Sequence, residues 1–160
     1  MFIADSPDQI LSLQDATSMS GLEFLQAMLD GKIAHAPICR PLNYRLHAVS
    51  EGRASFRGVP QFAHTNPAGS THGGWFGTLL DSCMACAVMS RLPKGSTYTT
   101  LEYKVNLLRA IPIGTEIEAV GEADHVGRST AVAHGKIRGV NDGRLYATGS
   151  TTCLVMQVKP

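Results

Sequence analysis

The spacing of apolar residues changes along the chain and predicts where helices give way to strands. Within residues 20–31, three leucines recur at helical spacing, and Ser20 with Glu23 makes a capping-box pattern that precedes a final Gly31. We expect a short amphipathic helix there. The segment 74–91 is apolar on nearly every side and contains no proline, so it predicts a long helix buried all round.

From residue 99 onward, apolar and polar residues alternate with the period of half-buried strands. Four such runs are separated by the turn sequences "IPIG", "HVGR" and "NDGR", and an earlier pair of runs splits at Glu51-Gly52 as a hairpin. We expect the four runs to form an antiparallel meander. Their inward positions are small, which lets a sheet curl closely around a helix: Ala119, Gly121, Ala131, Ala133, Gly135, Ala147 and Gly149.

The predicted fold class is therefore α+β, with a long central helix wrapped by a curved antiparallel β-sheet, which is the hotdog fold. A length of 160 residues with 44% hydrophobic and 17% charged residues suits one domain, 1–160. In it we expect an N-terminal arm and short helix over 1–41 and the hotdog core over 42–160. Residues 1–19 are weakly patterned and indicate a frayed or partner-contacting arm.

Charge and hydropathy exclude several classes of partner. The formal net charge of +1 gives no reason to expect nucleic acid or an anionic membrane as a partner. No apolar run approaches the length of a membrane span, and the first residues lack the pattern of a signal peptide. We therefore expect a cytoplasmic protein.

The chain has four cysteines, and two of them, Cys83 and Cys86 in "CMAC", have the CxxC spacing of zinc sites and redox sites. A structural zinc needs four ligands, however, and no second Cys/His pair stands at suitable spacing. A redox pair usually lies at the exposed start of a helix, whereas this one lies inside an apolar stretch. The pattern favours plain core packing, with no metal.

A lone carboxylate, Asp81, interrupts the apolar run from Gly73 to Ser90. An unpaired buried carboxylate is costly, so Asp81 makes a structural hydrogen bond, caps a second helix beginning at Ser82, or has a chemical function. The preceding "STHGG" offers free backbone N–H groups and the positive end of a helix dipole, and glycines at 73 and 74 let a ligand oxygen approach. The stretch lacks phosphate-loop and GxSxG patterns, so an oxyanion site for acyl transfer fits it best.

The stretch "NPAGSTHGGWFGTLLDS" resembles the N-x5-H-G-G-x6-D pattern of the PaaI-like hotdog thioesterases, and the similarity extends over nearly the whole chain. The resemblance implies hydrolysis of acyl-CoA thioesters with no metal or organic cofactor. It implies that the Gly73 N–H polarises the carbonyl and that Asp81, supplied across a dimer interface, is the nucleophile or the base for water. Asn66 would orient the water or the carbonyl, and His72 would hold the loop or assist the leaving thiolate; on the residues alone, His72 could equally be a turn residue.

The same resemblance indicates further substrate contacts. Thr100, with Thr99 next, matches a hydroxyl that often completes such sites, and Gly74 flanks the carbonyl position. Arg128 is preferred to Arg109 and Arg91 as the contact for CoA phosphates. We expect an acyl pocket for aromatic or medium-chain groups, and the family resemblance slightly favours aromatic groups. The pocket is expected near Phe76, Trp75, Leu22, Phe24 and Met28.

The expected assembly is a homodimer or a dimer-of-dimers homotetramer. A non-catalytic acyl-CoA binder or sensor on the same fold remains the alternative. A hotdog dehydratase or hydratase fits the spacing from HGG to Asp less well.

Overall fold

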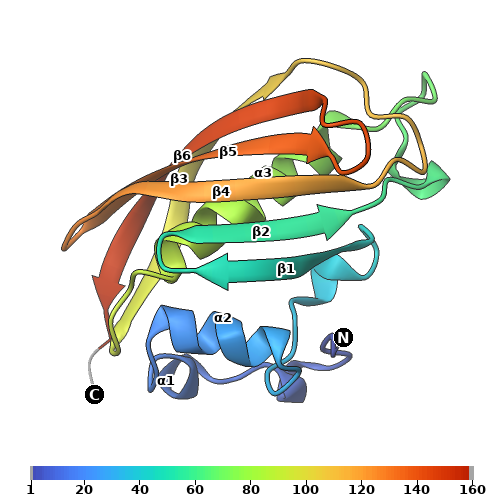
Figure 1. The fold of residues 1–160 in the computed structure, drawn as a ribbon. Coiled ribbons are helices and arrows are strands. Elements are labelled where there is room, and N and C mark those ends of the chain that lie inside the picture. The colour runs from blue at the N-terminus through green and yellow to red at the C-terminus, as the bar shows by residue number, and fades with distance from the viewer. Residues whose placement is uncertain (1, 159–160) are drawn as a thin grey trace.

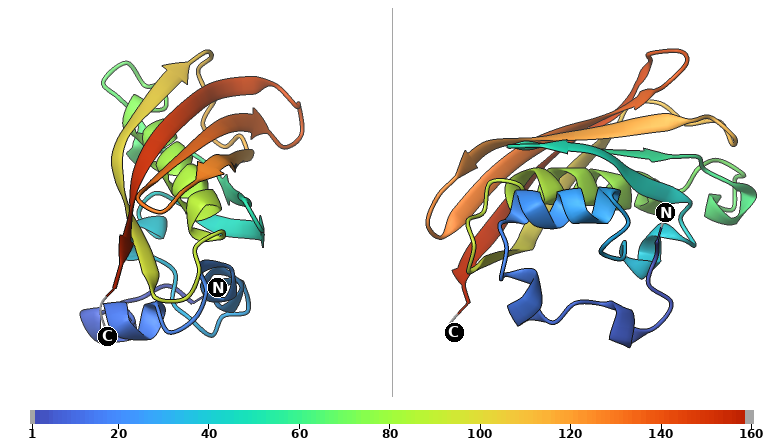
Figure 2. Two further views of the ribbon diagram at one scale, coloured as in Figure 1. Left: turned by 90° about the vertical axis from the view of Figure 1, so that its left-hand side faces the viewer. Right: turned by 60° about the horizontal axis from the view of Figure 1, so that its bottom comes forward.

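In the computed structural model, which describes residues 2–158, the helix α3 (Gly73–Met89) lies in the concave face of a curved, six-stranded antiparallel sheet (Figures 1 and 2). The α+β prediction and the wrapped central helix are confirmed. The strands are β1 (Tyr44–Ser50), β2 (Arg53–Gly58), β3 (Ser96–Leu107), β4 (Ile117–Val126), β5 (Thr130–Gly139) and β6 (Leu145–Gln157).

The order of strands across the sheet is β1-β2-β4-β5-β6-β3, so the predicted four-strand meander is wrong for β3. Strands β4, β5 and β6 do form a meander, but β3 pairs with β6 and occupies an edge. Residues 108–116 are a connection long enough to cross to the far side of β5, and the buried Ile111 anchors it. Alternating polarity identifies a strand, but it does not identify the neighbours of that strand.

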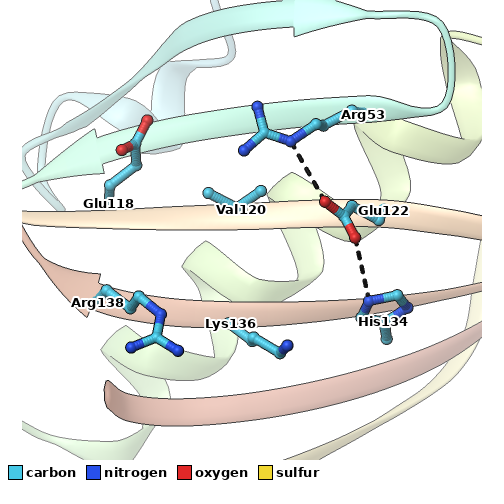
Figure 3. Close-up of a pocket in the computed structure, with 7 residues that line it drawn as sticks. All are labelled: Arg53, Glu118, Val120, Glu122, His134, Lys136 and Arg138. Carbon is cyan, nitrogen blue, oxygen red and sulfur yellow. Dashed lines mark hydrogen bonds and ion pairs between the residues drawn. The ribbon is translucent and has the colours of Figure 1, made fainter. Parts of the chain in front are cut away.

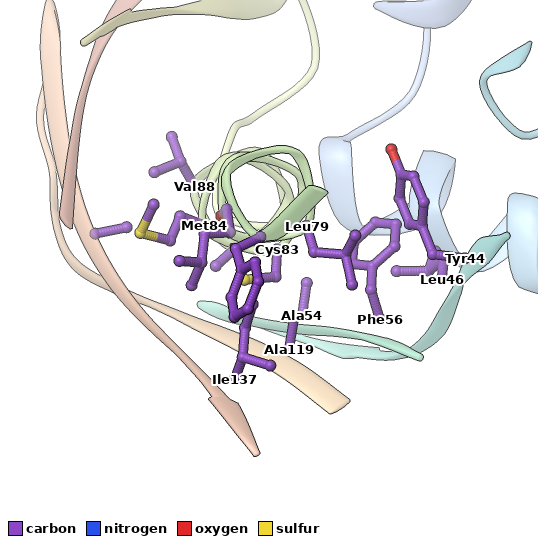
Figure 4. Close-up of a cluster of buried hydrophobic side chains, with 14 of the residues drawn as sticks. Tyr44, Leu46, Ala54, Phe56, Leu79, Cys83, Met84, Val88, Ala119 and Ile137 are labelled. Atoms are coloured by element: carbon purple, nitrogen blue, oxygen red, sulfur yellow. Dashed lines mark hydrogen bonds between the residues drawn. The ribbon is translucent and has the colours of Figure 1, made fainter. Parts of the chain in front are cut away.

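Three glycines let the sheet approach α3 closely. Gly121, Gly135 and Gly149 are paired in register across β4, β5 and β6, and all three are buried. A Cβ atom on Gly121 would overlap the backbone of α3 at Cys83. The side chains of α3 that face the sheet, among them Leu79, Cys83 and Met84, fill the remaining space (Figure 4). The small inward positions predicted from the sequence therefore have the expected role.

Helix α3 is continuous from Gly73 to Met89, close to the predicted 74–91. His72 is its N-cap residue, and Asp81 lies in its middle. The alternative in which Asp81 caps a second helix beginning at Ser82 is therefore wrong. The apolar character of α3 on nearly every side reflects its packing against all six strands of the sheet.

The N-terminal segment packs against the edge of the sheet formed by β1. It contains η1 (Pro7–Gln9), α1 (Leu13–Ala16), α2 (Gly21–Leu29) and η2 (Pro37–Cys39), and η3 (Phe62–His64) follows β2. Helix α2 begins with both hydrogen bonds of the predicted Ser20–Glu23 capping box and lies beside β1 (Figure 1). The Ala4 N–H donates to the His35 carbonyl and the Gly95 N–H donates to the Thr17 carbonyl, so hydrogen bonds tie this arm to the rest of the chain at these two points. None of the helices within residues 2–158 is both long and apolar enough to cross a membrane.

Candidate active site

Asp81 is half-buried on the side of α3 that faces β3, and a strand residue is its partner. The Thr100 hydroxyl donates a hydrogen bond to Asp81 Oδ1 at 3.0 Å. A bulge at Leu101 interrupts the pairing of β3 with β6 just after Thr100. Thr99 is exposed and has no contact with the carboxylate, so the structure brings Thr100 and not Thr99 to Asp81.

The start of α3 offers one free N–H group. His72 Nδ1 accepts a hydrogen bond from the Gly74 N–H at 2.9 Å, so His72 caps the helix and occupies that donor. Among the hydrogen bonds of residues 2–158, none uses the N–H of Gly73, the first residue of the helix. The Gly73 N–H is therefore the donor that can bind an oxygen atom at the positive end of the helix dipole.

Asn66 shapes the loop before α3. Its Oδ1 atom accepts hydrogen bonds from the N–H groups of Ala68 (3.0 Å) and Ser70 (3.2 Å), and its Nδ2 atom donates to the Ser70 hydroxyl (2.9 Å). The amide has two hydrogens on Nδ2, so one remains for a substrate or a water molecule. The loop is further fixed by the Thr71 hydroxyl, which donates to the Ile111 carbonyl at 2.7 Å.

Helix α3 and strand β3 run side by side in opposite directions. A Cβ atom on Gly73 would lie 3.1 Å from Leu107, and one on Gly77 would lie 3.4 Å from the Tyr103 ring, while Thr100 contacts Asp81. Residues 73 and 81 are two turns of helix apart, a rise of about 12 Å. One chain therefore does not bring Gly73 and Asp81 to the same reacting atom.

A cavity of about 240 Å³ opens beside Asp81 and Thr100. Of the residues expected to line an acyl pocket, only Met28 lines it. Phe76 and Trp75 are instead 2% and 3% exposed, and they pack edge to face in the core, because their side of α3 faces the sheet and the segment around Leu42. Phe76 therefore has no surface to offer a substrate.

Several residues of this cavity were missed from the sequence, namely His35, Ile38, Cys39, Tyr44, Phe56 and Tyr98. Tyr98 stands two residues before Thr100 on β3, so strand alternation alone could have identified it. The residues between 35 and 39 line the cavity because the N-terminal segment packs against α3 and β1, which no local pattern indicates.

Arg128 lies exposed in the turn between β4 and β5 and forms no ion pair with any residue in the range 2–158. Arg109, in contrast, donates a hydrogen bond to the Leu145 carbonyl at 2.8 Å. A wider groove of about 430 Å³ borders His72 and Gly74 at the other end of the site.

A further hollow, of about 320 Å³, lies on the outer face of the sheet (Figure 3). Within it, Glu122 contacts Arg53 at 3.4 Å and His134 at 3.3 Å, whereas Lys136 and Arg138 form no ion pair with any of residues 2–158. None of the predicted site residues lines it.

All four cysteines are free; Cys39, Cys83 and Cys153 are buried, and Cys86 is half-buried. Cys83 is fully buried in the core, and burial raises the pKa of the Cys86 thiol to about 12. The thiolate needed for redox chemistry is therefore disfavoured. Among the described residues, no three potential metal ligands of the His, Cys, Asp or Glu type gather at one point.

Comparison with known proteins shows which family the chain resembles. Residues 68–146 match the family model of the thioesterase superfamily. A Caenorhabditis elegans protein named "putative esterase" is 30% identical over 102 residues, which are 64% of this chain and 60% of that protein. The chain thus spans less than two thirds of the length of this relative.

Solved structures agree with the family match. A Ralstonia eutropha protein, described as a "putative thioesterase, phenylacetic acid degradation-related protein", is 27% identical with a TM-score of 0.73, over 81% of this chain and 98% of that one. A Streptococcus pneumoniae "hypothetical thioesterase protein", solved with coenzyme A, is 26% identical with a TM-score of 0.66, over 74% of this chain and 89% of that one. Over residues 68–146 the chain is therefore similar to the thioesterase superfamily, and the structure has the hotdog fold.

Proposed function

We propose that this protein is an acyl-CoA thioesterase that hydrolyses aryl- or medium-chain acyl-CoA to the free acid and CoA. The observation that carries the proposal is the Thr100 hydrogen bond to the half-buried Asp81, next to a cavity large enough for an acyl group. The superfamily match supports thioester hydrolysis, and the coenzyme A in the Streptococcus pneumoniae relative supports CoA as the thiol.

In the proposed reaction, the thioester oxygen binds the free Gly73 N–H, where the helix dipole stabilises the negative charge that develops as the carbonyl is attacked. The Asp81 carboxylate either takes a proton from the attacking water or attacks the carbonyl carbon itself. The C–S bond then breaks and CoA leaves as the thiolate, which takes up the proton that was removed from water. If Asp81 attacks the carbonyl, the product of this step is a mixed anhydride with Asp81, and a water molecule hydrolyses it to release the acid and restore the carboxylate. No metal or organic cofactor is required.

The remaining residues position these groups. Thr100 orients the Asp81 carboxylate by its hydrogen bond. The free Nδ2 hydrogen of Asn66 is available for the water or the carbonyl, and His72 holds the start of α3. Arg128, a cation with no ion-pair partner among the described residues, attracts the CoA phosphates.

The site is proposed to be shared by two copies of the chain, with Asn66 and Gly73 from one copy and Asp81 from the other. The separation of about 12 Å between residues 73 and 81 along one helix supports this arrangement. The edge strand β3 supports it as well, because it exposes Leu101, Tyr103 and Leu107, and the exposed Leu108 follows directly after the strand. An exposed apolar edge strand promotes aggregation, so proteins usually cover such an edge. In a two-fold dimer, the same surface of the second copy would cover it.

The experiment that tests the function is thiol release from a panel of aryl and aliphatic acyl-CoAs. We expect turnover of several members of the panel without added metal. Tight binding of acyl-CoA without thiol release would instead identify a non-catalytic acyl-CoA binder, and failure of both binding and release would overturn the proposal.

A further inference from the structure

His64 is a buried histidine outside the proposed reaction, and each nitrogen of its ring has a hydrogen-bond partner. It is 6% exposed and ends η3, two residues before Asn66. Its Nδ1 atom accepts a hydrogen bond from the Gln61 N–H at 2.9 Å, so Nδ1 bears no hydrogen. Its Nε2 atom lies 2.7 Å from the Pro41 carbonyl oxygen, which can only accept, so Nε2 carries the hydrogen and donates it. The two partners therefore fix one tautomer and one orientation of the ring.

The ring of His64 also packs against the first turn of α3. It stacks on the indole of Trp75, with the ring centroids 6.2 Å apart and an angle of 24° between the planes. The Trp75 Nε1–H donates to the Leu42 carbonyl at 2.9 Å, next in the chain to the Pro41 carbonyl that His64 binds. Residues 41–42, η3 and the start of α3 are thereby joined at one point. We call the side chains of His64 and Trp75, with the Pro41 and Leu42 carbonyls, the histidine clamp.

The backbone of His64 holds the base of the loop before α3. Its carbonyl accepts a hydrogen bond from the His72 N–H at 2.8 Å, and an antiparallel bridge closes the loop one residue further in. The loop between these two histidines, 65–71, carries Asn66, and Gly73 follows directly after it. A change in the orientation of His64 would therefore displace Asn66 and the helix start at Gly73 together.

We infer that His64 is a positioning residue: through the histidine clamp it sets where the Gly73 N–H and the Asn66 amide lie relative to each other. The inference rests on the proposed function. The clamp and both groups that it positions belong to one copy of the chain, so this geometry does not depend on where the second copy lies. A donor for a developing oxyanion acts by being held in place before the reaction. A misplacement of about 1 Å can lower a rate about a hundredfold.

Two substitutions of His64 and one matched control test the inference. His64→Leu removes both hydrogen bonds and the aromatic stacking but keeps an apolar side chain in the buried position. His64→Gln retains an amide N–H that can reach the Pro41 carbonyl, so it is the milder change. The control is Ser90→Ala at the other end of α3. Ser90 is 4% exposed, and its hydroxyl accepts a hydrogen bond from the Gly52 N–H at 2.8 Å, so it also joins a loop to an end of the helix.

The kinetic measurement is kcat and KM for the acyl-CoA that the unmodified protein cleaves best, with folding checked by circular dichroism and stability by urea unfolding. We expect His64→Leu to lower kcat about tenfold to a hundredfold with KM nearly unchanged, because the groups that it displaces act on the transition state. His64→Gln should lower kcat less, about threefold to tenfold. Ser90→Ala should lower the free energy of unfolding and leave kcat nearly unchanged, as expected for a residue that only stabilises the fold.

A second measurement does not need turnover. Nitrogen chemical shifts of the unmodified protein should show a hydrogen on His64 Nε2 and none on Nδ1. Hydrogen exchange of the backbone amides is then compared between the start of α3 and the core strands β4 and β5. His64→Leu should speed exchange of the His72 and Gly74 N–H groups more than exchange in the core strands, whereas Ser90→Ala should not.

The inference is overturned if folded His64→Leu keeps the kcat of the unmodified protein, or if Ser90→Ala lowers kcat as much as His64→Leu does. Should His64→Leu not fold, a His64→Gln protein with unmodified kcat overturns it instead. If no acyl-CoA is cleaved, the proposed function fails, and hydrogen exchange alone decides. Faster exchange confined to the start of α3 in the His64 variant then supports the clamp, and unchanged exchange there overturns it.

Discussion

At the scale of single residues, Asp81 is the group on which the proposed chemistry depends. Asp81→Asn keeps the shape of the side chain and its ability to accept the Thr100 hydrogen bond, but it removes the negative charge. Because a nucleophile or general base is lost, we expect kcat to fall by about 10³-fold or more. Asp124→Asn, which changes an exposed carboxylate of β4, is the control and should retain activity. Near-normal turnover by a folded Asp81→Asn protein would contradict the assignment.

The two possible roles of Asp81 can also be separated. After a single turnover in heavy-oxygen water, the label enters the Asp81 carboxylate only if that carboxylate attacked the thioester and was released by water. Label in the product acid alone is expected for attack by water with Asp81 as the base, and also for an anhydride that water opens at the acyl carbon, so label in Asp81 is the result that decides between the two roles.

Thr100 and Thr99 form a matched pair of neighbours on β3. Thr100→Val removes the hydroxyl that donates to Asp81, whereas Thr99→Val removes an exposed hydroxyl that does not reach the site. A hydrogen bond to a charged group contributes about 1.5–3 kcal/mol, so we expect kcat to fall by about tenfold to a hundredfold for Thr100→Val and little for Thr99→Val. Steady-state kinetics of both variants checks this. Equal effects would show that Thr100 does not orient the carboxylate.

At the scale of secondary-structure elements, the distance between α3 and the sheet depends on glycine. Gly121→Ala places a Cβ atom against the Cys83 backbone of α3, which cannot move without shifting the helix. Gly135→Ala, its cross-strand neighbour, meets side-chain atoms of Met84 and Leu80, and a methionine can rotate away. Overpacking of this kind costs about 1–3 kcal/mol, and we expect Gly121→Ala to lie at or above the top of that range.

Urea unfolding of the two glycine variants gives the comparison. The free energy of unfolding should fall more for Gly121→Ala than for Gly135→Ala. The opposite ranking would indicate that α3 moves more easily than the side chains around it.

The turn between β4 and β5 is the element assigned to CoA binding. Arg128 is proposed to attract phosphates and not to take part in the reaction, so Arg128→Ala should raise KM, weaken the salt dependence of KM and leave kcat nearly unchanged. Arg138→Ala on the outer face of the sheet is the control for a general change of charge. Kinetics at low and high salt measure both effects, and a pure loss of kcat would show that the role is misassigned.

At the scale of the whole molecule, the proposed site needs two chains. Two inactive proteins, Asp81→Ala and Asn66→Ala, are mixed and their subunits allowed to exchange. A hybrid dimer has one doubly damaged site and one site with both residues intact. With random pairing about half of the dimers are hybrids, so roughly a quarter of the unmodified activity should return.

The mixing experiment requires tag capture to prove that subunits exchanged. Proven exchange without recovery would rule out a shared site, because every chain in the mixture carries a damaged residue and a site built from one chain cannot recover.

Local sequence patterns were sufficient to predict many of the helices and strands of this molecule. The capping box at Ser20 and Glu23, the long apolar helix and the alternating strands each depend on residues near one another in sequence, so their periods appear directly in the chain. The small inward residues of β4, β5 and β6 predicted that the sheet could wrap α3, since small side chains leave room for a helix to approach the sheet closely. The isolated carboxylate at Asp81 marked a candidate site, because burying a charge in an apolar helix has a cost that must be offset.

The arrangement of these parts was decided only in three dimensions. Strand β3 pairs with β6 and not with β4. The alternation of apolar and polar residues could not predict this, because the backbone of a strand can form its hydrogen bonds with any neighbouring strand. Phe76 was expected at the substrate and lies in the core, since the face of α3 that meets the sheet depends on how the helix is rotated about its axis. The cavity beside Asp81 is closed by residues 35–39 through packing between segments far apart in the chain. The sequence by itself thus determined the elements and the chemical groups, while tertiary packing decided which of those groups meet.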